Sequence, residues 1–311
     1  MTTAFALSGG GNLGPMQAGT VLALVEGGIE PDLLVGTSVG ALNAAFLSTR
    51  PGLAGARKLM AASSALRRRE AFRFDLLTVL AGFFGVRDNL ISAHHLRGLI
   101  RRWVQIERIE EATTPLAMTA TDALTGEPVI LDSGDIGDAL AASSAIPGLL
   151  PPVQIDGRWL VDGSLSANRP VLQAQELGAD EVYVITTDTA ARLRPPRGAV
   201  AMAMNSVSLV TARVAQEQLA AAMRHAMNTG GRVVVVPSPQ PPAPGPFDFR
   251  RSAALADAAY RRTVAWLLEE APLSSGAGPA GSVPLPEPVA SGVGIAEPIG
   301  LELGPEAEEL L

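Results

Sequence analysis

The chain has 311 residues, of which 47% are hydrophobic, and a formal net charge of −7 at pH 7. It is long enough to bury a substantial core as one large domain or two modest ones. The acidic balance argues against a protein that binds nucleic acid through phosphate contacts, and the absence of cysteine excludes disulfides and thiolate metal sites.

The N-terminal residues predict a strand rather than a signal peptide. Residues 3–8 are apolar, follow no basic segment and lead directly into glycines. No run of about 18 uncharged apolar residues, the length that spans a bilayer, occurs in the sequence. We therefore expect a cytoplasmic protein with no signal peptide or transmembrane helix.

The first 50 residues alternate between strands and helices. The strand at 3–8 leads into a glycine-rich loop over 8–14, and a helix begins at Pro15 and ends near Glu26. A second strand covers 33–37, and a helix follows from Val39 to Ser48. This order predicts a parallel, doubly wound sheet that helices cover on both faces.

Residues 51–112 form a helical excursion from this pattern, and its apolar piece at 76–86 favours a buried helix over a lid or a lipid-facing surface. The later elements alternate again. They are strands at 115–122, 127–131, 181–187 and 232–236, helices at 135–143, 170–177, about 199–228 and 252–270, and a hairpin at 154–161. Gly, Pro, Ser and acidic residues dominate after Pro272, so we expect one domain over 1–271 and a disordered tail over 272–311.

The segment Gly36-Thr37-Ser38-Val39-Gly40 between the second strand and its helix has the pattern of a nucleophile elbow. Glycines flank the serine in such a bend because larger side chains would clash with neighbouring backbone. The bend lifts the serine Oγ out of the sheet at the positive end of the following helix. The pentapeptide alone is a weak signal, but its context makes Ser38 the candidate nucleophile.

The loop Gly9-Gly10-Gly11-Asn12-Leu13-Gly14 allows two interpretations. Its G-x-G-x-x-G spacing matches the dinucleotide-binding fingerprint, which also needs an acidic residue at the end of the second strand. Here Asp32 precedes that strand, which disfavours a nucleotide site. The alternative is an oxyanion hole, in which the amides of Gly10, Gly11 and Asn12 would stabilise developing negative charge.

A serine nucleophile needs a base, and the three histidines are poorly placed to supply one. His94 and His95 open a helix, and His225 lies within a long helical stretch, so we expect structural or surface roles for them. Asp162-Gly163 instead follows a short strand directly, and a carboxylate that contacts the serine hydroxyl can take its proton. We therefore favour a Ser38–Asp162 dyad.

Taken together, these segments resemble the patatin-like phospholipases. The glycine loop, the Ser38 elbow and Asp162-Gly163 stand in that family's order, as do Ser143-Ser144-Ala145-Ile146-Pro147-Gly148 and Asn168-x-Pro170. The resemblance extends over about residues 3–236 and implies a three-layer α/β/α sandwich. It further implies Ser38 as nucleophile, Asp162 as base and an oxyanion hole built on Gly9, Gly10, Gly11, Asn12 and Gly14, with Gly36, Gly40 and Gly163 in support.

Two residues depart from the family pattern. Leu13 stands where Arg or Lys is usual, which removes a cation from beside the glycine loop and favours uncharged esters over lipid phosphates. Ser164 stands where Gly or Ala is usual and is small enough to be harmless. Neither change touches the backbone amides.

The predicted function is serine-dependent hydrolysis of lipid carboxylic esters through an acyl-enzyme, with no metal or organic cofactor. The expected partner is a lipid or acyl-ester substrate, with peripheral membrane contact and no nucleic acid. Two alternatives stay open: acyl transfer by the same dyad, and a non-catalytic lipid-binding or regulatory module.

Overall fold

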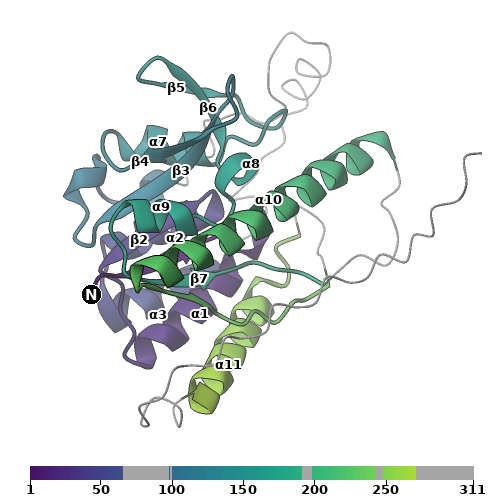
Figure 1. Ribbon diagram of the computed structural model, residues 1–311. Helices are drawn as coiled ribbons and strands as arrows, with labels where there is room; N and C mark the ends of the chain where they lie inside the picture. The colour runs from purple at the N-terminus through teal and green to yellow at the C-terminus, as the bar shows by residue number, and fades with distance from the viewer. Residues whose placement is uncertain (66–97, 99, 191–197, 243–247, 271–311) are drawn as a thin grey trace, which may run out of the picture. The chain divides into compact units, whose positions relative to one another are not determined.

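A mixed, mostly parallel sheet runs through the part of the chain that the computed structural model describes, residues 1–65, 98, 100–190, 198–242 and 248–270 (Figure 1). Its parallel strands, in spatial order, are β3 (Leu116–Asp122), β2 (Leu33–Thr37), β1 (Thr3–Leu7), β7 (Glu181–Ile185) and β8 (Arg232–Val235). Its antiparallel strands are β4 (Pro128–Leu131), β5 (Val153–Ile155) and β6 (Arg158–Asp162).

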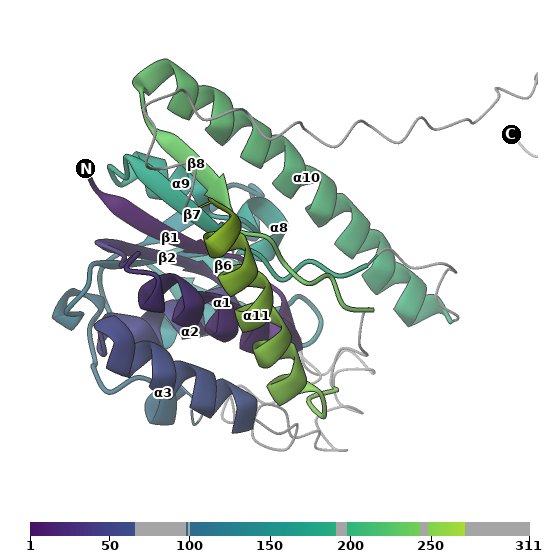
Figure 2. The same cartoon turned by 90° about the horizontal axis from the view of Figure 1, so that it is seen from below.

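Helices cover both faces of this sheet (Figure 2). One face carries α1 (Gly14–Glu26), α2 (Val39–Ser48), α3 (Gly52–Ala65), α7 (Ile136–Ser143) and α11 (Ser252–Glu270). The other carries α9 (Val171–Glu176) and α10 (Ala199–Thr229), with α8 (Ser164–Ala167) against α10 and β3. The predicted α/β architecture is therefore confirmed.

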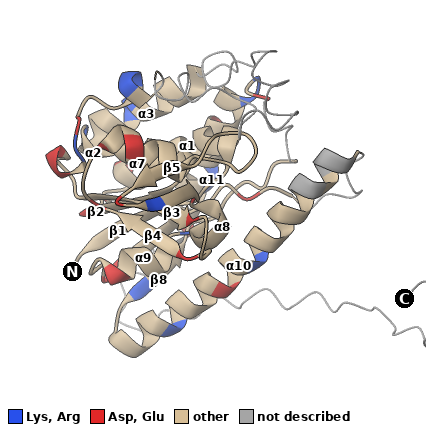
Figure 3. Cartoon of the chain, turned by 90° about the horizontal axis from the view of Figure 1, so that it is seen from above, with Lys and Arg blue, Asp and Glu red and all other residues tan. Residues whose placement is uncertain are grey.

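Helix α10 is far longer than the strands that it connects. Its 31 residues rise about 46 Å, whereas β7 spans only about 17 Å. Because β7 and β8 are parallel, α10 runs from the side of the sheet where the strands have their carboxyl ends back to the side with their amino ends, where Arg232 N donates to Asp180 O. Its N-terminal half therefore projects beyond the carboxyl end of the sheet. The first charged residue of the helix is Arg213, and Figure 3 shows no charge on the described part before it.

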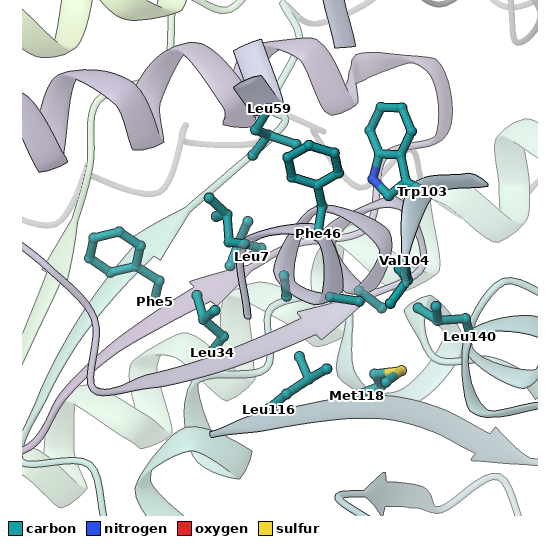
Figure 4. Close-up of a cluster of buried hydrophobic side chains, with 14 of the residues drawn as sticks. Phe5, Leu7, Leu34, Phe46, Leu59, Trp103, Val104, Leu116, Met118 and Leu140 are labelled. Atoms are coloured by element: carbon teal, nitrogen blue, oxygen red, sulfur yellow. The ribbon is translucent and has the colours of Figure 1, made fainter. Parts of the chain in front are cut away.

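Alternation along β1 divides the core into two apolar clusters. Phe5 and Leu7 join Leu34 in the cluster under α1, α2 and α3, and Figure 4 shows them with Phe46 and Leu59 from the helices. Ala4 and Ala6 point to the opposite face, toward α9 and α10. The larger side chains of β1 thus face the larger helical layer.

One edge of β3 brings two distant segments end to end. Thr37, the last residue of β2, pairs with Thr119, and Asp162, the last residue of β6, pairs with Ala120. At these positions β4 pairs with the opposite edge of β3. Strands β2 and β6 therefore pair with the same edge of β3, one after the other along its length. The ends of β2 and β6 therefore meet at consecutive residues of β3.

The element ranges predicted from sequence agree with these strands and helices to within two residues. The short helix α8 was not predicted, and neither was the pairing of β6 with β3. Within the helical excursion, α3 and the 3₁₀ turn Ile109–Glu111 are described. The apolar piece at 76–86 and the tail over 272–311 lie outside the described residues.

Gly19 sets the distance between α1 and α11. A Cβ on Gly19 would lie against Ala256 O and only 3.0 Å from Tyr260 N, and both atoms belong to the α11 backbone. We expect Gly19→Ala to lower the free energy of unfolding by about 1–3 kcal/mol in urea titrations, despite the higher helix propensity of alanine. Gly98→Ala is the matched control, since its Cβ would meet no atom of the described residues within 4 Å. Equal stability of the two variants would contradict this account of the α1–α11 contact.

Candidate active site

The elbow holds Ser38 in a backbone conformation that side chains rarely adopt. Ser38 has φ 54° and ψ −120° between β2 and α2. A Cβ on Gly36 would lie 2.5 Å from Ala41 N, and one on Gly40 would lie 2.6 Å from Ser8 O. The two flanking glycines are thus required by the tightness of the bend, as the sequence pattern indicates.

The hydroxyl of Ser38 contacts Asp162 directly. Ser38 Oγ donates to Asp162 Oδ2 over 2.8 Å, and the two residues are 7% and 3% exposed. They are 124 residues apart in the chain and come together because β2 and β6 end on the same edge of β3.

Both the carboxylate and the main-chain carbonyl of Asp162 accept further hydrogen bonds. Its Oδ1 accepts from Ser164 N over 2.8 Å, and its carbonyl accepts from Thr121 Oγ1 over 2.9 Å. Burial raises the pKa of the Asp162 carboxyl above its ordinary value, while the hydrogen bonds from Ser164 and Ser38 act in the opposite direction. The carboxylate is therefore a stronger base than an exposed aspartate.

Some backbone amides of the glycine loop donate hydrogen bonds within the protein, and others have no acceptor among the described residues. Gly9 N donates to Asn168 O over 3.0 Å, and Gly14 N donates to Gly11 O. The amides of these two glycines of the expected oxyanion set are therefore engaged in hydrogen bonds within the protein. Within the described residues, the amides of Gly10 and Gly11 have no hydrogen-bond acceptor.

Tight packing explains why the loop consists of glycines. Positions 9 and 10 leave no room for a Cβ, which would strike Asn168 Oδ1 at 2.6 Å and Thr187 Cβ at 2.6 Å respectively. Gly163 similarly faces Thr119, whose Oγ1 would lie 2.7 Å from an added Cβ. The loop is thus clamped between the segment after α8 and the segment after β7.

Two buried amides connect the glycine loop to the elbow helix. Gln17 Nε2 donates to Ser8 O over 2.6 Å, and Asn43 Nδ2 donates to Gln17 Oε1 over 2.9 Å and to Gly14 O over 3.1 Å. Sequence reasoning missed both residues. Their only signal was an uncharged polar side chain on an otherwise apolar helix face.

His225 and the side chains of Asn12 and Leu13 take no part in the Ser38–Asp162 contact. His225 is exposed on α10, and His94 and His95 lie outside the described residues. Asn12 Nδ2 donates to Asp248 O over 2.9 Å, and Leu13 is buried with Met16, Leu255 and Ala259. Leu13 thus packs against α11. The described residues contain no group of three or more His, Asp or Glu side chains that could hold a metal.

Three comparisons relate this chain to known proteins. VipD from Legionella pneumophila matches with a TM-score of 0.44 and 16% identity, covering 86% of this chain and 67% of VipD. Lysophospholipase nte1 of Aspergillus terreus is 28% identical over 183 residues, which are 58% of this chain and 11% of that protein. An uncharacterized NTE family protein of Mycobacterium tuberculosis is 32% identical over 207 residues, covering 62% of this chain and 31% of that protein.

The chain therefore spans less than a third of the length of either of these relatives. The family model described as patatin-like phospholipase matches residues 5–174, more than half of the chain, and this range includes the glycine loop, Ser38 and Asp162. The chain belongs to the patatin-like phospholipase family.

Proposed function

We propose that this protein is a serine-dependent hydrolase of carboxylic esters in lipids, with Ser38 as nucleophile and Asp162 as base. The observation that carries the proposal is the 2.8 Å hydrogen bond from Ser38 Oγ to Asp162 Oδ2 on a strained elbow. Membership of the patatin-like phospholipase family and the name of the lysophospholipase relative support a lipid substrate.

In the first half of the reaction, Ser38 Oγ attacks the acyl carbonyl carbon while its proton passes to Asp162. The tetrahedral intermediate collapses to an acyl-enzyme, and the departing alcohol takes the proton from Asp162. In the second half, water attacks the acyl-enzyme and gives its proton to Asp162. The fatty acid leaves when this proton returns to Ser38.

The oxyanion of each tetrahedral intermediate faces the amides of Gly10 and Gly11. Such donors contribute about 2.7–4 kcal/mol each to transition-state stabilisation in other acyl-transfer enzymes. Because neighbouring backbone fixes the loop, these donors do not reorganise during the reaction. This arrangement accounts for a loop that excludes side chains at both positions 9 and 10.

We further propose that the projecting half of α10 rests on the lipid surface that holds the substrate. No charged residue occurs between Gly198 and Ala212, and Val207, Leu209 and Val210 are 51%, 65% and 64% exposed. This half extends past the carboxyl edge of the sheet, where Ser38 also lies. None of the described helices has the length and apolar character of a bilayer span.

Replacing either member of the dyad tests the mechanism. Ser38→Ala and Asp162→Asn are each expected to lower kcat/KM for p-nitrophenyl esters by about 10³-fold or more, since each removes an essential chemical group. His225→Ala, on the exposed face of α10, serves as the control with unchanged activity. Full activity of Ser38→Ala would contradict the proposal. Loss of activity in His225→Ala would indicate a triad that includes His225 in place of the dyad.

Burial of the Asp162 charge has a consequence for stability. Because the folded-state pKa is raised, the carboxylate costs stability once the pH exceeds the pKa of the unfolded chain, and the full cost is present above the folded pKa. We expect Asp162→Asn to raise Tm near neutral pH, by about 2–4 °C for each kcal/mol gained. The gain should vanish in acid, where Asp162 is protonated. Calorimetry over a range of pH measures the difference in Tm between the variant and the wild type. A lower Tm of Asp162→Asn at neutral pH would show that the buried carboxylate does not destabilise the fold.

The role of α10 can be tested separately from catalysis. In a Ser38→Ala background, Leu209→Ser with Val210→Ser is expected to weaken binding to vesicles of phosphatidylcholine and phosphatidylglycerol about five- to tenfold in sedimentation assays, because apolar surface no longer leaves water. Met227→Ser, at the opposite end of α10 and 83% exposed, is the matched control. Equal binding by both variants would rule out this surface.

A further inference from the structure

One side chain of α7 contacts the strained residue of the elbow. Ser143, the last residue of α7 and fully buried, accepts a hydrogen bond at Oγ from Ser38 N over 2.9 Å. Its main-chain carbonyl accepts from Gly163 N over 3.3 Å, and the carbonyl of Ala145 accepts from Asp162 N over 3.0 Å. The segment from Ser143 to Ala145 therefore contacts both members of the proposed dyad.

We propose that Ser143 is a positioning residue that holds Ser38 in its attacking conformation, a role that rests on the proposed function. Ser143 touches no reacting atom. It fixes the backbone from which Ser38 Oγ projects, and its carbonyl fixes the strand end that carries Asp162.

The Ser38 amide needs this partner for a geometric reason. Ser38 is the N-cap residue directly before α2, so its own carbonyl accepts from Leu42 N, while its amide points away from the helix. A buried amide without an acceptor is costly, and it would favour any rearrangement that gives it one. A residue at φ 54° has such a rearrangement close at hand, because relaxation to negative φ relieves strain at the same time. The Ser143 hydroxyl opposes that relaxation.

The neighbouring residue supplies a matched control. Ser144 follows Ser143 directly and is 8% exposed, but its Oγ has no hydrogen-bond partner among the described residues. Ser144→Ala therefore removes a hydroxyl of the same kind from the same end of α7 without removing a contact to Ser38. A general loss of packing would affect both positions alike.

The test measures the second-order rate at which a fluorophosphonate labels Ser38 in the full chain, at a temperature well below the Tm of every variant. Ser143→Ala should slow labelling about 10- to 100-fold, as expected when a buried donor loses its acceptor. Ser143→Cys keeps the side-chain volume but accepts poorly and should also be slow, whereas Ser143→Thr keeps the hydroxyl and should restore most of the rate. Ser144→Ala should react like the wild type.

The pH profile separates positioning from disruption of the dyad. Because Ser143 does not contact the Asp162 carboxylate, the acid limb of the labelling rate should keep its midpoint in Ser143→Ala while the plateau falls. Labelling of Ser143→Ala and Ser143→Cys at the wild-type rate, or equal slowing in Ser144→Ala, would overturn the role of Ser143 alone. A wild-type protein that is not labelled at Ser38 would contradict the proposed function itself.

Discussion

The candidate site depends on one constraint, the shared edge of β3. Consecutive residues Thr119 and Ala120 pair with the last residues of β2 and β6, so two strands that run in opposite directions end against each other. This register brings Ser38 Oγ within 2.8 Å of Asp162 Oδ2, because each residue lies at the end of its strand. A slip of one residue in either pairing would turn the side chains to the other face of the sheet and separate the pair.

Around this junction the fold holds two features that oppose stability, a serine at positive φ and a buried carboxylate. The compensating contacts come from all sides. Gly36 and Gly40 let neighbouring backbone close in, Ser164 N contacts the carboxylate, and the Gln17–Asn43 pair connects the glycine loop to α2. Strain and desolvation concentrated in one place, and supported by the surrounding core, are what a preorganised reaction centre requires.

Much of this arrangement was predictable from sequence because it is recorded in local patterns. The alternation of strands and helices gave the α/β class, and the glycines around Ser38 and before Pro15 marked the turns whose close packing the structure displays. Sequence could not give the register of β6 on β3, because pairing across 124 residues leaves no local pattern. Nor could it identify the roles of Gln17, Asn43 and Ser143, because their hydrogen-bond partners come from distant parts of the chain. Gly9 is a residue of the glycine motif, but the motif does not reveal that its amide donates a hydrogen bond to Asn168 O.

The long separation between Ser38 and Asp162 bears on how the chain is synthesised. At an elongation rate of about 5–20 residues per second, Asp162 is added roughly 6–25 s after Ser38. During that interval the elbow sequence exists without β6, without its proposed base and without the β3 edge fully paired. During synthesis, Ser38 would therefore be unreactive toward any lipid that the nascent chain contacts. The proposed reactivity would begin only when β6 pairs with β3, so completion of folding would itself be the step that starts it.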